Sequence, residues 1–78
     1  MIARTIPELT SDLDLWEVVL TTGTTLRVRA HGVAERQGFH VFVALMKGEP
    51  AYEYELLRVP VAAVEEISGG RPKPGPRL

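Results

Sequence analysis

The chain has no cysteine among its 78 residues, so it can form neither a disulfide nor a thiolate metal site. Its two histidines, His31 and His40, have no carboxylate at ligand spacing, and we therefore expect no metal site and no cofactor. The two serines, Ser11 and Ser68, fall in predicted loops or in the tail. Because nucleophilic catalysis needs a nucleophile beside an activating base, these absences predict a protein that is not an enzyme.

Long apolar runs are also missing. No segment is long enough for a signal peptide or a membrane span, so a cytoplasmic location is the expectation. Residues 1–67 carry six basic and ten acidic side chains, whereas residues 68–78 carry three basic and none that is acidic. An acidic body argues against general nucleic-acid binding. Arginine outnumbers lysine seven to two, and alanine, valine and glycine are abundant, a composition typical of GC-rich bacteria.

The length of the chain limits the number of domains. A chain this short forms one domain, and its core supplies only about 3–5 kcal/mol, so without disulfides we expect oligomerisation. Residues 1–14 are a lead-in segment, for which an irregular path and one helical turn after Thr5 both remain open. Residues 15–68 are the β domain. Residues 69–78, rich in proline, glycine and basic side chains, are expected to be a disordered tail.

A β-hairpin over residues 16–30, WEVVLTTGTTLRVRA, is the clearest prediction. Apolar and polar residues alternate on both sides of a Thr-Thr-Gly-Thr turn, the pattern of strands with one buried face. A two-residue loop would place buried residues opposite exposed ones, which the side-chain period of two forbids. A three-residue loop over residues 21–23 instead pairs Val18 with Leu26 and Glu17 with Arg27, and places Gly23 at a left-handed position. A loop over residues 22–24 also keeps the faces, but it pairs Glu17 with Arg29 and makes no use of the glycine, so we favour the first.

Residues 39–46, FHVFVALM, form the most apolar strand, and both of its faces are apolar. Such a strand lies in the centre of a covered sheet, bends around a barrel core, or offers one face to a partner. Turns are predicted on either side of it, at residues 37–38 and 47–50. The segment before it, His31 to Gly38, is expected to extend the second hairpin strand past a bulge at Gly32.

The remaining pattern is a strand over residues 52–59 with a change of face at Leu56–Leu57, a one-turn 3₁₀ helix at residues 61–64, and a short strand carrying Ile67 inward. The segment LRVPVAAVEEI, residues 57–67, resembles the closing part of five-stranded SH3-like and Sm-like barrels. The resemblance implies a small, mostly antiparallel, partly open barrel, and it assigns no function.

Two surfaces are candidates for binding. The apolar strand and the next strand offer Phe42, Met46, Tyr52 and Tyr54, with Tyr52 and Tyr54 either forming an aromatic docking strip or covering the core. We therefore predict a non-catalytic interaction module that self-associates or binds another protein. The alternative is a nucleic-acid-binding barrel that uses the basic tail and three arginines, Arg27, Arg29 and Arg36.

Overall fold

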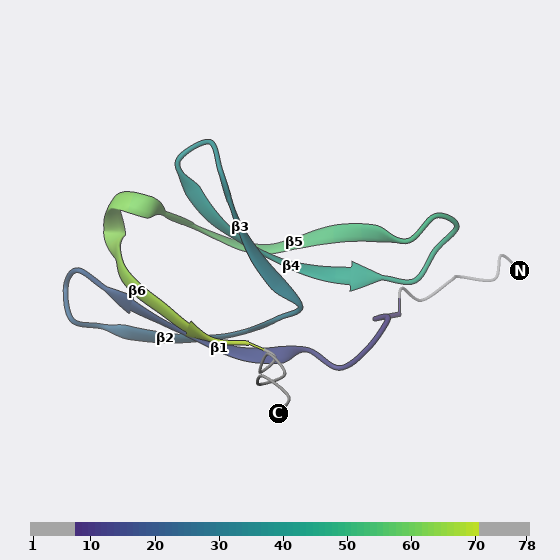
Figure 1. The fold of residues 1–78 in the computed structure, drawn as a ribbon, viewed down its shortest axis with the longest axis horizontal. Helices are drawn as coiled ribbons and strands as arrows, with labels where there is room; N and C mark the ends of the chain where they lie inside the picture. The colour runs from purple at the N-terminus through teal and green to yellow at the C-terminus, as the bar shows by residue number, and fades with distance from the viewer. Residues whose placement is uncertain (1–7, 71–78) are drawn as a thin grey trace, which may run out of the picture.

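The computed structural model describes residues 8–70, which form six strands and one 3₁₀ turn (Figure 1). The strands make two three-stranded antiparallel sheets, one in the order β2-β1-β6 and the other in the order β3-β4-β5. The predicted mostly β architecture is confirmed, but the expected count of five strands is wrong, and no strand pairing within residues 8–70 closes the sheets into a barrel. The strands are β1 (Asp14–Leu20), β2 (Thr25–Ala30), β3 (Gly32–Arg36), β4 (Phe39–Met46), β5 (Tyr52–Pro60) and β6 (Val64–Gly69).

The β1–β2 hairpin has the predicted register, with Glu17 opposite Arg27 and Val18 opposite Leu26. The Leu20 N–H donates to the Thr24 carbonyl oxygen at 2.8 Å, which closes a three-residue loop. Gly23 takes a φ of 91° in that loop, a conformation that side chains with a Cβ rarely adopt. Side-chain parity excluded the two-residue loop, and the position of Gly23 selected this register over the shifted loop of residues 22–24.

The protein has six strands, one more than expected, because the chain leaves one sheet at His31 and enters the other. The predicted second strand does not continue through Gly32, because β2 ends at Ala30 and β3 pairs with β4 instead. The expected turn at residues 37–38 is present, with both Gln37 and Gly38 in the left-handed region. What appeared to be one bulged strand is thus the link between the two sheets.

The predicted 3₁₀ turn is confirmed at Val61–Ala63, between β5 and β6. Its backbone joins two distant loops, because the Val61 N–H donates to the Gly38 carbonyl oxygen and the Ala63 carbonyl oxygen accepts from the Thr21 N–H. The predicted face change in β5 is also present, as a register shift between Phe42 and Val43 of β4 that leaves Leu56 unpaired.

The core lies between the two sheets, with Val18, Ala30 and Phe42 fully buried at its centre. Trp16 meets Phe42 edge to face, with 6.1 Å between ring centroids, and its Nε1–H donates to the Ala30 carbonyl oxygen at 3.0 Å. Ile67 packs against this cluster as expected. Other partly buried residues surround it, namely Leu20, Leu26, Val28, Val33 and Val64.

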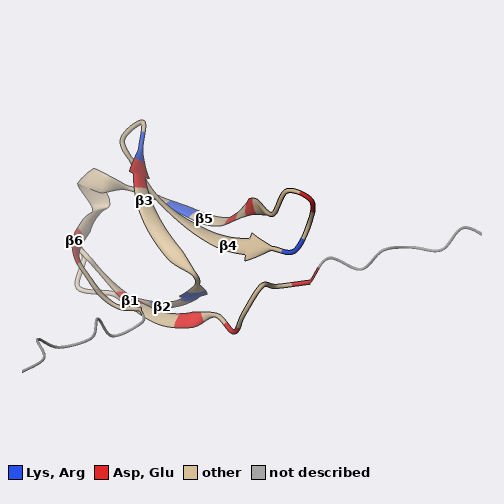
Figure 2. Cartoon of the chain, turned by 45° about the vertical axis from the view of Figure 1, so that its right-hand side comes forward, with Lys and Arg blue, Asp and Glu red and all other residues tan. Residues whose placement is uncertain are grey.

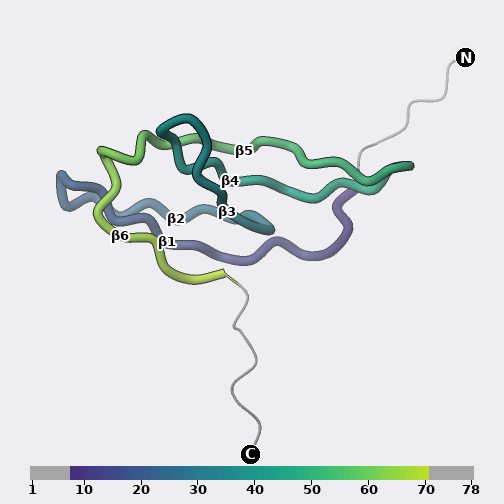
Figure 3. Tube along the Cα trace, turned by 45° about the horizontal axis from the view of Figure 1, so that its top comes forward, coloured from purple at the N-terminus to yellow at the C-terminus, as the bar shows by residue number. Residues whose placement is uncertain are grey.

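The described part of the lead-in, residues 8–13, contains no helical turn. It runs beside the end of β4, where Leu9 forms an isolated antiparallel bridge with Met46 (Figure 3). Residues 71–78, which include most of the predicted tail, lie outside the described residues, as do residues 1–7. Within residues 8–70 there is no helix with the length and hydropathy needed to cross a membrane.

Candidate interaction surface

The strand β5 is the most exposed strand of the protein. It lies at the edge of its sheet, with β4 on one side and no strand of the described chain on the other. Four large apolar or aromatic residues are exposed along it, Tyr52 at 46%, Tyr54 at 58%, Leu56 at 41% and Leu57 at 37%. An unpaired edge that also carries exposed apolar side chains is the arrangement expected of a binding strand.

The register with β4 shows which way the β5 side chains point. Tyr52 lies opposite Met46 and Leu57 opposite Phe42, so the tyrosines and Leu57 share the face that carries the core. They are nevertheless exposed, because the hairpin of β4 and β5 extends past β2 and β6 (Figure 1). The structure thus makes Tyr52 and Tyr54 surface residues, whereas it places Phe42 and Met46 in the interior.

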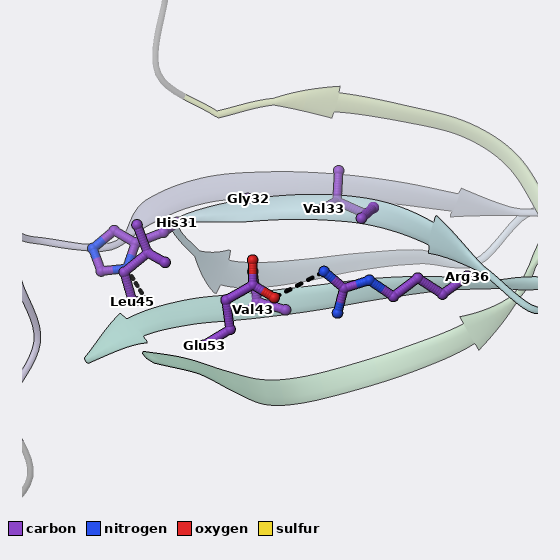
Figure 4. Close-up of a pocket in the computed structure, with 8 residues that line it drawn as sticks. His31, Gly32, Val33, Arg36, Val43, Leu45 and Glu53 are labelled. Atoms are coloured by element: carbon purple, nitrogen blue, oxygen red, sulfur yellow. Dashed lines mark hydrogen bonds and ion pairs between the residues drawn. The ribbon is translucent and has the colours of Figure 1, made fainter. Parts of the chain in front are cut away.

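The second apolar face of β4 is covered within the chain at Val41 and Val43, whereas Leu45 on the same face is 42% exposed. Val41 and Val43 are only 2% and 7% exposed, although both point away from the core. Figure 4 shows the side chains of Arg36 from β3 and Glu53 from β5 meeting over Val43, with 2.8 Å between Arg36 Nη2 and Glu53 Oε2. The shallow groove beside them has a volume of about 210 Å³. At Val43, the two-sided apolar pattern therefore reflects a strand that long charged side chains cover on its outer face.

A second ion pair lies on the same outer face. Arg58 donates to both carboxylate oxygens of Glu55, at 3.0 Å from Nε and 2.8 Å from Nη2, and its guanidinium lies 5.2 Å from the centre of the Phe39 ring. The hydrogen bond from Arg58 holds the pKa of Glu55 below its ordinary value, and the same bond raises the pKa of Arg58. Glu53, Glu55 and Arg58 therefore form a charged row on the face opposite the tyrosines.

The three arginines of the nucleic-acid alternative do not form one patch. Arg27 lies 3.7 Å from Glu17 in one sheet, and Arg36 is paired with Glu53 in the other. Arg29 shares the outer face of β2 with Arg27, and no carboxylate from residues 8–70 is within ion-pair distance of it. Figure 2 shows basic and acidic residues interleaved over both sheets. The nucleic-acid alternative stays a prediction from sequence.

His31 has a role that the sequence did not reveal. Its Nδ1 accepts a hydrogen bond from the Leu45 N–H at 2.7 Å, so the ring proton must lie on Nε2, which donates to the Ser11 carbonyl oxygen at 2.9 Å. Ser11 Oγ is 3.0 Å from the same Nε2. Because that nitrogen already carries the proton, it has no lone pair with which to activate the serine. His31 therefore joins the lead-in, the bend and β4.

Other evidence of a chemical site is limited. No group of three or more potential metal ligands occurs among residues 8–70. Comparison with protein-family models, with curated proteins and with solved structures gave no match for this chain. The geometry of the exposed β5 edge is therefore the basis for a functional hypothesis.

Proposed function

We propose that this protein is a non-catalytic interaction module that binds a protein chain, either another copy of itself or a different protein, through the β5 edge. The observation that carries the proposal is the coincidence of an unpaired edge with four exposed apolar or aromatic residues between Tyr52 and Leu57. The backbone of such an edge supplies hydrogen bonds to an added strand, and the tyrosines supply area and polar hydroxyls.

The same proposal includes a finer description of the fold. The order β5, η1, β6 supports the expectation that the two sheets are halves of a partly open SH3-like or Sm-like barrel. Among the described residues, the strand orders leave β2, β3, β5 and β6 each with an unpaired edge, and β5 is the one that carries exposed aromatic residues.

The test compares two exposed sites with matched substitutions. Chemical cross-linking in host lysate, followed by mass spectrometry, is run on the wild type, Tyr54→Asp and Leu15→Asp. Leu15 is 43% exposed on β1, in the other sheet, and is the control for loss of a surface apolar residue.

We expect one or more protein adducts, including adducts between copies of the chain, that are retained in Leu15→Asp and lost in Tyr54→Asp. Adducts that survive unchanged in both variants, or the absence of any adduct, would contradict the proposal.

A further inference from the structure

We infer that the strand added to β5 is the β5 strand of a second copy, paired antiparallel about a two-fold axis between Glu55 and Leu56. This inference rests on the proposed function and specifies its partner. It comes from the order of charged and apolar side chains along β5. When a second β5 strand is laid antiparallel beside the first, an acidic residue of each copy meets a basic residue of the other, and aromatic residues meet apolar ones.

The faces of β5 are the first requirement for such pairing. Tyr52, Tyr54 and Leu57 share the core face, whereas Glu53 and Arg58 share the outer face with Glu55. The bulge at Leu56 is the reason that residues five apart, Glu53 and Arg58, point the same way. Two β5 strands related by a two-fold axis keep their faces matched only in registers that respect this bulge.

Charge complementarity, together with the length of the ladder, selects among those registers. With the axis between Glu55 and Leu56, Glu53 of each copy lies opposite Arg58 of the other, and the contact occurs twice. On the core face, the exposed ring of Tyr54 lies opposite the exposed side chain of Leu57, and the ring of Tyr52 lies opposite Val59, which is already buried within its own chain. Cross-strand pairs of these kinds stabilise antiparallel sheets.

The ends of the strand fit the same register. The ladder runs from Tyr52 to Val59 on both copies and leaves out Pro60, which has no N–H to donate. Charged side chains on an edge ordinarily discourage pairing. Here each of the two contacts between Glu53 and Arg58 would bring opposite charges together. A shift by two residues would place Glu55 opposite Arg58 instead, but it shortens the ladder to residues 54–59, because a longer one would include Pro60.

Charge reversal in the full chain tests the register directly. Sedimentation equilibrium is run on the wild type, on Glu53→Arg, on Arg58→Glu and on an equimolar mixture of the two variants. Each reversal alone places like charges at both contacts and is expected to raise the dimer dissociation constant at least about tenfold. The mixture restores opposite charges at both contacts, so its dissociation constant should return to within about threefold of the wild type.

Glu55→Arg is the matched control, because Glu55 lies on the same face and is also ion-paired, but it does not face Arg58 of the second copy in this register. A mixture of Glu55→Arg with Arg58→Glu should therefore show no rescue. Circular dichroism melting of each variant separates lost association from lost folding.

A wild type that stays monomeric at millimolar concentration would overturn the inference, and so would rescue by Glu55→Arg in place of Glu53→Arg. If the wild type is monomeric but Tyr54-dependent adducts with a different protein form in lysate, only the second-copy inference fails. If neither association occurs, the proposed function fails as well.

Discussion

His31 Nδ1 accepts a hydrogen bond of 2.7 Å from the backbone N–H of Leu45, while its Nε2–H donates to the Ser11 carbonyl oxygen at 2.9 Å. The first bond ties the bend between the sheets to the end of β4, and the second ties it to the lead-in. One side chain therefore holds together three segments that are separate in the sequence.

We expect His31→Ala to lower the free energy of unfolding by about 1–3 kcal/mol, because it removes both bonds and leaves the Leu45 N–H without its acceptor. His31→Asn should lose less, since its amide oxygen can accept from Leu45. His40→Ala is the control, because no hydrogen bond of the His40 side chain occurs within residues 8–70. Urea unfolding measures the energies, and faster amide exchange at Leu45 in His31→Ala would locate the effect. Equal losses at His31 and His40 would contradict this role.

The outcome at His31 illustrates what the sequence predicted and what it did not. The hairpin register followed from parity and one glycine, because a period of two excludes the two-residue loop and Gly23 favours the register that pairs Val18 with Leu26. The break at His31 depends on hydrogen bonds to residues 14 and 20 positions away, which no local pattern encodes.

The candidate site shows the same division. Alternation in residues 52–55 indicated a strand with tyrosines on one face, and the structure has that strand. Their exposure depends on how far the opposite sheet extends, and sequence alone could not settle this. The burial of Val43 under Arg36 and Glu53 likewise depends on side chains from two other strands.

Alanine substitutions at three glycines distinguish two causes of destabilisation, backbone strain and steric clash of the added Cβ. At Gly69, with a φ of 104°, a Cβ would lie 2.5 Å from the Leu15 carbonyl oxygen, so strain and a clash with backbone coincide. At Gly23, with a φ of 91°, no atom lies within 4 Å, so only strain applies. At Gly32 there is neither a positive φ nor a neighbour within 4 Å.

We expect Gly23→Ala to cost about 1–2 kcal/mol from strain alone, and Gly69→Ala to cost clearly more. Gly32→Ala should be neutral or stabilising by up to about 1 kcal/mol, because alanine restricts the unfolded chain. Urea unfolding of the three variants gives the order. A Gly69→Ala variant as stable as Gly32→Ala would show that β6 does not pass this close to Leu15.

The pair formed by Glu55 and Arg58 makes a prediction about titration. The Arg58 hydrogen bond lowers the pKa of Glu55, so any stability from this pair is present above the carboxyl's unfolded pKa and is lost as the pH falls through the folded pKa. We expect Arg58→Gln to raise the pKa of Glu55, and Arg27→Gln, in the other sheet, to leave it unchanged. Carbon-detected NMR titration of the Glu55 carboxyl measures both. An unchanged pKa in Arg58→Gln would mean that the bidentate contact does not persist in solution.

Substitutions of Arg36 test whether this residue stabilises the outer face of β4 through its charge or through the apolar part of its side chain, which shields Val43 from water. Its ion pair with Glu53 is exposed, and such pairs contribute about 0–1 kcal/mol. If the apolar stem matters more, because it lies with Glu53 over Val43, Arg36→Met should keep nearly all of the unfolding free energy. Arg36→Ala should then lose about 1 kcal/mol, as apolar area on Val43 becomes exposed. Arg27→Met and Arg27→Ala are the controls, because Arg27 has a similar ion pair in a more exposed position. Chemical unfolding of the four variants decides between the two roles, and an equal loss in both Arg36 variants would show that charge, rather than cover, protects the second face of β4.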